Sequence, residues 1–572
     1  MRRQRRSFKL LALILGLSLV AAACGGDDDD DEADAGSDTE AQEEDVATQE
    51  GGELVLGAEQ EPDCMAWTLS CSGASWGFWT AQVNTMPRSF DIVKQDDGTW
   101  DYEPSILLEG EPELQLEPEQ VVTYKIAEEA VWSDGTPITC QDYVFTWDHV
   151  KNGDDIYDRT GFQDIGSVEC PDEKTAVVTF ETPYAGWKQL FGGQFGILPS
   201  HILEGQDISA IMANGYDFSG GPWKIEAWNR GTSIVLVPNE NWWGEPKPTL
   251  ERVTFQIVAD TAAEFEAFKA GEVQAIYPQP QLDAVEEIAD GIDGTSSSIN
   301  ADSTPNLEAL WINNEKFPFD SQAVRQAFAY ALDRGAIVEA LFGELGITEA
   351  SQSFNATILG DFGDPDAFAG YEQDLDKVDE LMEGDGWEKG SDGIWAKDGQ
   401  RAEVVFRTTE GNARRELTQD VIREQAAEAG FEVTIDNLAA GDLFGQALPQ
   451  GDFQLALYAQ VLTSLEPSIS SLFVSGNIPT AENGFSGQNW TRTRIPEADE
   501  PLLETDRNPD EEERSAAMAE ADKLLAEDAT SIPLDPLPNL FLWRDEIVGP
   551  QDGEDNPIFG PFSDMHEWAL RA

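Results

Sequence analysis

The middle of the chain contains the stretch Leu307-Glu-Ala-Leu-Trp-Ile-Asn-Asn-Glu-Lys-Phe-Pro-Phe-Asp-Ser-Gln-Ala-Val-Arg-Gln-Ala-Phe-Ala-Tyr-Ala-Leu-Asp-Arg334. Its first six residues, five of them apolar, predict a short strand. Val324, Phe328 and Ala331 then recur at the spacing of one helical face, which predicts a helix over residues 321–332. A strand followed by a helix is the unit from which α/β domains are built.

The same alternation of strands and helices extends in both directions along the chain. Further strands are expected over residues 53–57, 121–126, 176–180, 234–237, 253–258, 404–406, 431–435 and 453–458. Further helices are expected over residues 261–270, 282–288, 417–429 and 511–527, and another begins at Thr139 or Asp142. Residues 51–572 are too many for one hydrophobic core, so at least two α/β lobes are expected.

The first residues of the chain predict a secretory signal. Five basic residues precede an apolar run over residues 10–20, which leads into Ala21-Ala-Ala-Cys24. The run is shorter than the roughly 20 residues that a bilayer-spanning helix needs. The pattern resembles a bacterial lipoprotein signal, which implies that residues 1–23 are removed and that Cys24 is acylated and anchored in the membrane.

An acidic segment follows the signal. Residues 25–50 contain thirteen acidic residues and no basic or aromatic ones, so residues 24–50 are expected to be a disordered tether. The whole chain has a formal net charge of −75. Nucleic-acid binding is therefore not expected, because phosphate recognition needs a basic surface.

Four cysteines remain beyond Cys24, and an even number in an exported protein predicts two disulfides. Of the three possible connectivities, Cys64 with Cys71 and Cys140 with Cys170 is preferred, because each bond then closes a local loop. Buried free thiols are the alternative.

Sequence signals for catalysis are absent. The three histidines are scattered, and neither Gly-x-Ser-x-Gly nor His-Glu-x-x-His occurs. No enzymatic activity and no cofactor or bound metal are therefore expected.

Several stretches have a recognisable order. They are Val122-Thr-Tyr-Lys-Ile126 through Asp142-Tyr-Val-Phe-Thr146, Leu198-Pro-Ser-His-Ile202, Gly220-Gly-Pro-Trp-Lys224, Asn239-Glu-Asn-Trp-Trp-Gly244, and the stretch 312–334 within the segment quoted first. Together they resemble landmarks of the peptide/nickel-type family of extracellular solute-binding proteins. The likeness runs through nearly the whole body of the chain.

The resemblance implies a two-lobed periplasmic-binding-protein-like fold of class II, or cluster C, type, with a ligand cleft between lobes joined by hinge strands. The first lobe, with an extra subdomain, would span residues 51–305, the second lobe 306–530, and residues 531–572 would return to the first. The chain would cross near residues 304–307 and return near 531–534.

The resemblance also implies a function. Such a monomeric protein captures oligopeptides at the extracytoplasmic face of the membrane, holds them as an added β-strand, and delivers them to the permease of an ABC importer. A binder of an oligosaccharide or a metal chelate with the same fold is the alternative, and a surface receptor without a permease is another.

Candidate cleft residues are aromatic and polar side chains near strand ends. They are Trp76, Trp79, Trp223, Trp311, Asn313, Tyr458, Gln460, Thr463 and Glu466. In many members of the family an Asp before a Glu-Pro pair binds the α-ammonium of the ligand. That position falls near Thr463 here, which argues against a free N-terminus as the anchor.

Overall fold

The computed structural model describes residues 47–572 except 70, 72–74, 96, 194–195, 279–281, 301–303, 463 and 554. The predicted signal, Cys24 and most of the predicted tether lie outside the described residues. Within the described part of the chain, no helix has both the length and the apolar character needed to cross a membrane.

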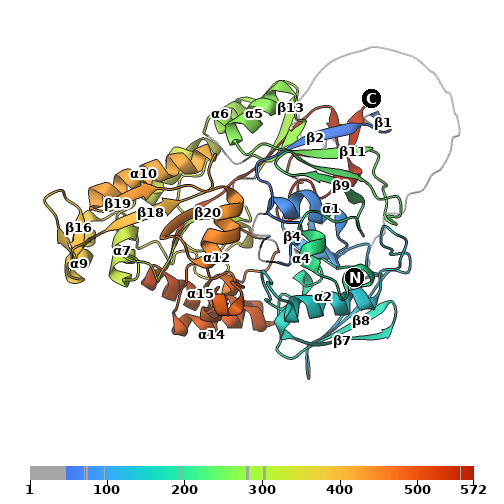
Figure 1. The fold of residues 1–572 in the computed structure, drawn as a ribbon, viewed down its shortest axis with the longest axis horizontal. Helices are drawn as coiled ribbons and strands as arrows, with labels where there is room; N and C mark the ends of the chain where they lie inside the picture. The colour runs from blue at the N-terminus through green and yellow to red at the C-terminus, as the bar shows by residue number, and fades with distance from the viewer. Residues whose placement is uncertain are drawn as a thin grey trace, which may run out of the picture. The chain divides into compact units, whose positions relative to one another are not determined.

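The first lobe, residues 51–300 and 539–572, is built on a seven-stranded mixed sheet in the order β13-β22-β12-β2-β11-β10-β9 (Figure 1). Its strands are β2 (Glu53–Ala58), β9 (Trp223–Asn229), β10 (Ser233–Pro238), β11 (Arg252–Ile257), β12 (Ala275–Ile276), β13 (Thr295–Asn300) and β22 (Asn539–Arg544). Helices α5 (Thr261–Ala270) and α6 (Leu282–Asp290) lie between β11 and β13 in the chain. β2 pairs in parallel with β11 and β12, which puts the first strand of the body at the centre of the sheet.

An additional subdomain is inserted between β2 and β9. It contains a four-stranded antiparallel sheet in the order β5-β6-β8-β7, a two-stranded ladder of β3 with β4, and several helices. The elements are α1 (Val83–Thr85), β3 (Phe90–Lys94), β4 (Trp100–Pro104), β5 (Glu113–Gln115), β6 (Val121–Lys125), α2 (Cys140–Asn152), β7 (Ile165–Asp172), β8 (Thr175–Phe180), α3 (Ser200–Leu203) and α4 (Ile208–Met212).

The second lobe, residues 306–536, is built on a five-stranded sheet in the order β19-β18-β20-β14-β21. The strands are β14 (Asn306–Ile312), β18 (Glu403–Arg407), β19 (Glu432–Ile435), β20 (Leu455–Val461) and β21 (Ile532–Pro536). The helices are α7 (Gln322–Tyr330), α8 (Arg334–Phe342), α9 (Leu375–Gly384), α10 (Ala413–Ala429), α11 (Ala440–Asp442), α12 (Leu448–Gln450), α13 (Ser470–Phe473), α14 (Pro496–Arg507) and α15 (Glu511–Asp528).

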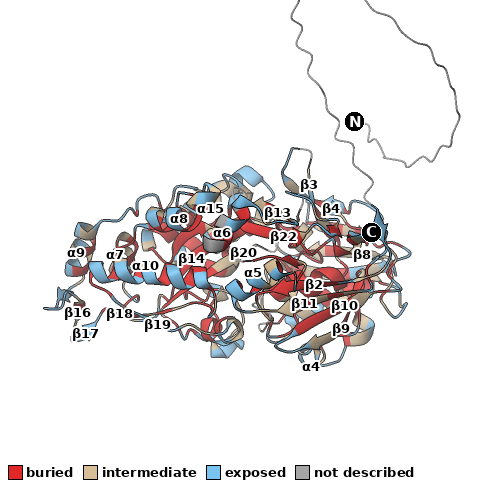
Figure 2. Cartoon of the chain, turned by 90° about the horizontal axis from the view of Figure 1, so that it is seen from above, coloured by how far each residue is buried: buried red, intermediate tan, exposed pale blue. Residues whose placement is uncertain are grey.

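Short strands complete the described chain. β15 (Glu388–Lys389), β16 (Trp395–Lys397) and β17 (Gln400–Arg401) form a three-stranded sheet, and β1 (Thr48–Gln49), β24 (Ala569–Arg571) and β23 (Ile547–Val548) form another. Figure 2 shows buried strands at the centre of each lobe and exposed outer faces on helices such as α10. All seven residues of β14 are buried.

The return to the first lobe comes later than expected. β21 pairs with β14 in the second sheet, and β22 pairs with β13 in the first. The crossing therefore lies at Leu537 and Pro538, beyond the expected residues 531–534. The difference arises because the apolar residues of β21 are buried in the core of the second lobe.

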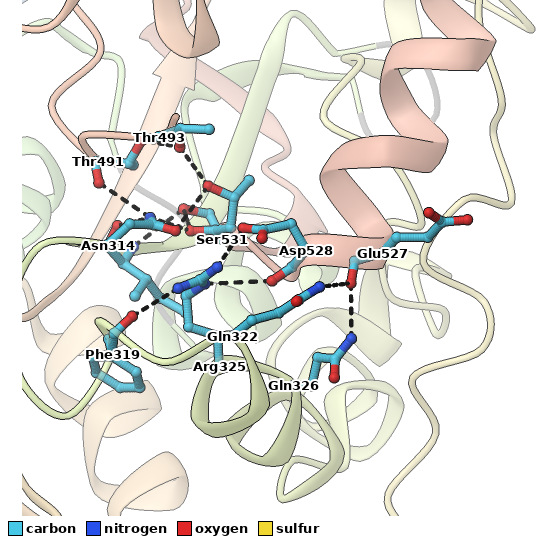
Figure 3. Close-up of polar contacts among 12 residues, drawn as sticks. Asn314, Phe319, Gln322, Arg325, Gln326, Thr491, Thr493, Glu527, Asp528 and Ser531 are labelled. Atoms are coloured by element: carbon cyan, nitrogen blue, oxygen red, sulfur yellow. Dashed lines mark hydrogen bonds and ion pairs between the residues drawn. The ribbon is translucent and has the colours of Figure 1, made fainter. Parts of the chain in front are cut away.

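The sequence landmarks act mainly inside the lobes. Asp142 accepts hydrogen bonds from the Thr139 backbone at 2.9 Å and from the Ser200 backbone at 2.8 Å, so it joins the start of α2 to α3. In the second lobe the Arg325 guanidinium contacts the Phe319 carbonyl and the Asp528 carboxylate at the end of α15 (Figure 3). These landmarks fix α2 against α3 and α7 against α15.

Candidate functional site

A cleft lies between the two lobes and opens to solvent. Its space, including solvent at the mouth, is about 1380 Å³. The first lobe contributes residues from the segments 64–78 and 157–190 together with Tyr216, and the second lobe contributes residues from 444–490. The lining is rich in aromatic rings, namely Trp67, Phe78, Tyr157, Tyr184, Tyr216, Phe444, Tyr458 and Trp490.

The first-lobe wall is an irregular segment that a disulfide closes. Cys64 is bonded to Cys71, seven residues later, and Cys64 itself lines the cleft. Trp67 lies inside this loop and packs edge-on against Tyr216, with ring centroids 5.6 Å apart. The disulfide joins the two ends of a loop without regular secondary structure, and thereby limits the positions available to Trp67.

The second-lobe wall is the C-terminal half of β20. Pairing of β20 with β18 reaches only Ala456, whereas pairing with β14 continues to Val461. The edge of residues 458–461 on the β18 side therefore has no strand partner within the described residues. The same residues line the cleft. An unpaired strand edge offers backbone donors and acceptors to an extended ligand.

The lobes are joined by hydrogen bonds along the rim of the cleft. Gln488 donates to the Asp158 carboxylate at 2.8 Å, and Ser486 donates to the Ile156 carbonyl at 2.6 Å. Elsewhere the Leu465 backbone N–H donates to the Tyr102 hydroxyl at 2.9 Å. Each bond joins a first-lobe residue to a second-lobe residue, so these bonds hold the two walls of the cleft together.

Three of the candidate cleft residues line the cleft: Tyr458, Gln460 and Glu466. Gln460 is half-buried, and no hydrogen bond joins its side chain to another residue within the described part of the chain. Glu466 forms an ion pair with Arg514 of α15, with Oε2 and Nη2 2.9 Å apart. Thr463 lies outside the described residues.

The other candidates are core residues, which corrects the expectation that they face the cleft. Trp76 and Trp79 pack edge-on against each other, with centroids 5.8 Å apart, inside the first-lobe core. Trp223 is fully buried at the start of β9. Trp311 lies beneath the cleft wall, where it stacks on Tyr458 at 5.1 Å and donates to the Tyr458 carbonyl at 2.8 Å.

Asn313 is also part of the core. It is fully buried and donates to the Gly451 carbonyl at 3.1 Å. Large aromatic side chains and hydrogen-bonded amides are suited to a core as well as to a binding site, and their sequence positions do not distinguish the two. Trp311 and Asn313 therefore act on the site only through the β14–β20 pair that they support.

Several cleft residues were not among the candidates. Trp67, Tyr157, Asp158, Gln488 and Trp490 lie in loops or irregular segments. Of these five residues, only Trp67 falls in the Trp-rich segment 63–79, which lacks a regular apolar pattern. The others carry no local signal; Asp158 and Gln488, for example, are separated by 330 positions and meet across the two lobes.

Buried carboxyl groups lie behind the cleft. Burial raises the pKa of Asp506 to about 7, opposed by hydrogen bonds from Ser468 and Ser470, both of which line the cleft. Burial also raises the pKa of Asp164 to about 6, against the opposing charges of Arg507 and Lys151. Both carboxyl groups are therefore protonated to a larger extent near neutral pH than an exposed Asp would be.

The second disulfide lies away from the cleft. Cys140 is bonded to Cys170, which joins the start of α2 to β7. Both pairings are those preferred from the local spacing. Within the described residues, no group of three or more His, Cys, Asp or Glu side chains is arranged to hold a metal ion.

Comparisons with known proteins agree with this architecture. The chain is 25% identical over 529 residues to the oligopeptide-binding protein OppA of Mycobacterium tuberculosis, covering 90% of this chain and 85% of that protein. The oligopeptide-binding protein AppA from Bacillus subtilis, in complex with a nonapeptide, has a TM-score of 0.78 at 21% identity, over 92% of this chain and all of that one.

A periplasmic EDTA-binding protein, EppA, has a TM-score of 0.76 at 23% identity, over 92% of this chain and 98% of that one. The two structures share the two-lobed fold with this chain. Residues 112–477 match the model for the middle region of the bacterial extracellular solute-binding proteins, family 5. That match covers more than half of the sequence, and the chain belongs to family 5 of the bacterial extracellular solute-binding proteins.

Proposed function

We propose that this protein is the substrate-binding component of an ABC importer and that it captures oligopeptides in the cleft between its lobes. The observation that carries the proposal is the edge of β20 at residues 458–461, which has no strand partner within the described residues and lines an aromatic cleft that opens to solvent. A peptide added to that edge would gain main-chain hydrogen bonds whatever its sequence. The aromatic rings would contact its side chains.

The relatives support a peptide as the ligand more than another solute. OppA and AppA are named as oligopeptide-binding proteins, and AppA holds a nonapeptide. EppA, which is named for EDTA, has the same fold, so a metal chelate or an oligosaccharide remains the alternative ligand. In this proposal the protein binds and releases its ligand and does not transform it.

Closure would couple ligand capture to delivery. The hydrogen bonds between the lobes would form on closure, and a ligand that contacts both lobes would stabilise the closed form over an open one. We infer that the closed protein, anchored through acylated Cys24 at the extracytoplasmic face, presents the ligand to the permease as a monomer.

The ligand can be identified directly. The protein is expressed without residues 1–46, so that β1 is kept, and is then purified and denatured. The released small molecules are analysed by mass spectrometry. A mixture of peptides supports the proposal, and their termini show whether a free N-terminus is required. A single sugar or chelate would retain solute binding but reject the peptide assignment.

A variant pair tests the location of the site. Gln460→Ala removes a half-buried amide from the cleft wall, and Gln400→Ala removes an exposed amide on β17. The loss of one ligand hydrogen bond corresponds to about 1 kcal/mol, so Gln460→Ala should weaken peptide binding about fivefold in calorimetry. Equal affinities for the two variants would place the ligand elsewhere.

A further inference from the structure

The charged residues that line the cleft are acidic. Asp158 and Glu466 line it, and no Lys or Arg does within the described residues. The undescribed residues closest in sequence to the lining, 70, 72–74 and 463, are Ser, Ser, Gly, Ala and Thr. Their side chains carry no charge wherever they lie. The charge of the described lining therefore comes from two carboxylates, whose environments differ.

Glu466 forms a direct ion pair, whereas Asp158 forms none within the described residues and interacts with the neighbouring Arg159 only at longer range. The Arg514 guanidinium contacts Glu466 at 2.9 Å, and both side chains are largely buried. Asp158 accepts hydrogen bonds from the Thr160 backbone at 2.9 Å, the Thr160 hydroxyl at 2.7 Å and Gln488 at 2.8 Å. All three donors are uncharged. They orient the carboxylate and leave its negative charge uncompensated by direct contact.

A second carboxyl group lies close behind the lining. The Ser470 hydroxyl, in the cleft, donates to Oδ2 of Asp506 at 2.6 Å, whereas Oδ1 of Asp506 is buried without a hydrogen-bond partner among the described residues. Asp158 and Asp164 both raise the pKa of Asp506, after the larger effect of burial. Asp506, whose pKa burial raises to about 7, is partly protonated at neutral pH, so it adds only part of a negative charge to that of Asp158 at this end of the cleft. A positive ligand group would be stabilised there.

We propose that the cleft selects peptides that carry a lysine or arginine side chain, placed against Asp158, over peptides that carry an acidic side chain at that position. This inference rests on the proposed function, because it specifies the class of peptide. Asp158 belongs to the first lobe and its partner Gln488 to the second. A cation bound there contacts the point where the lobes meet, so it stabilises the closed form.

The aromatic lining suits the rest of such a side chain. The alkyl stem of lysine or arginine packs on apolar and aromatic surfaces while its charged end reaches a carboxylate. Aromatic faces also attract the cation itself. Anionic side chains would meet the same rings and carboxylates with no basic group of the described lining to pair with.

The test uses three pentapeptides, Ala-Phe-Xaa-Phe-Ala, with Lys, Gln or Glu at the central position, and titration calorimetry at low and high salt. The expected order of affinity is Lys, then Gln, then Glu, with about tenfold between Lys and Gln. The preference should shrink in 1 M NaCl, because screening weakens partly exposed charge pairs.

Two variants locate the effect. Asp158→Asn keeps the shape of the side chain and the oxygen that accepts from Thr160, and the Gln488 amide can rotate to accept from the new NH2 group. It should reduce the preference for Lys over Gln to less than threefold. Asp154→Asn, in the same loop but exposed, should leave it unchanged. Thermal unfolding of each variant confirms that it is folded.

The outcomes separate the two proposals. Measurable binding of all three peptides with equal affinity, or with Glu preferred, overturns the charge selectivity and leaves peptide binding standing. A Lys preference that survives in Asp158→Asn overturns the role of Asp158. Absence of binding by all three peptides, together with a co-purified ligand that is not a peptide, overturns the proposed function and this inference with it.

Discussion

Replacing Glu308 by Gln should strongly destabilise the second lobe. Glu308 lies in β14 and is fully buried, and its carboxylate pairs with two guanidinium groups of α10. Arg414 Nη2 lies 2.8 Å from Oε2 and Arg415 Nε lies 2.7 Å from Oε1. The two arginines are also buried, so the three side chains clamp α10 to the sheet with little access to water.

The expected loss follows from the burial of these charges. Breaking a buried ion pair by removing one partner costs about 3–5 kcal/mol, because the remaining charge stays buried. Asp535 of β21 limits the loss. Burial raises its pKa to about 8, opposed by Arg414, and removing the Glu308 charge would favour ionised Asp535. The expected decrease in the free energy of unfolding is therefore at the lower end, about 3 kcal/mol.

Urea unfolding followed by tryptophan fluorescence measures this change. Glu315→Gln is the matched control, because Glu315 also pairs with an arginine, Arg494 at 3.1 Å, but both side chains are about half exposed. An exposed pair contributes about 0–1 kcal/mol, so this variant should unfold close to the parent. Equal midpoints for Glu308→Gln and Glu315→Gln would refute the assignment of a buried, clamping carboxylate.

Three further changes have defined outcomes. Asp506→Asn should stabilise the protein at pH 8 but not at pH 4. In the folded protein the Asp506 carboxyl has a pKa of about 7, against an ordinary value of 3.8, so the folded state holds the proton more tightly than the unfolded state. The free energy of unfolding therefore falls as pH rises from about 4 to 7, by at most about 4 kcal/mol. Unfolding temperatures that differ from the parent equally at pH 4 and 8 would contradict this. Removing the second disulfide with Cys140→Ser and Cys170→Ser releases a loop with a sequence separation of 30 and should cost about 3–4 kcal/mol in urea unfolding, with peptide affinity unchanged. Trp223→Phe changes a core residue, so its peptide affinity in calorimetry should stay within about threefold of that of the parent. A large loss of affinity would show that Trp223 acts on the ligand.

Elements with strong local signals were predicted well from the sequence. The helix expected over residues 261–270 is α5, because Asp260 caps its start by accepting from the Ala263 backbone and Gly271 ends it in a left-handed conformation. The order of strands and helices, and with it the two-lobed α/β class, follows from such local patterns.

Elements without local patterns were missed. β13 has the sequence Thr-Ser-Ser-Ser-Ile-Asn, which lacks apolar alternation, and it forms a strand because β22 pairs along its whole length. α8 was not expected either. It begins at Arg334, directly after α7, where the Asp333 side chain accepts from the Ala336 backbone.

The sequence by itself indicated the fold class, the family and the preferred pairing of the cysteines, because all three are carried by local patterns and ordered landmarks. Only the tertiary structure decided which aromatic rings face the cleft. Trp311 and Trp67 are both nearly buried, yet one supports Tyr458 from beneath and the other lines the cleft. Likewise Asp158 and Gln488 are separated by 330 positions and meet across the two lobes. Composition and periodicity report how each segment folds locally, whereas a binding site depends on which surfaces the packed lobes leave facing each other.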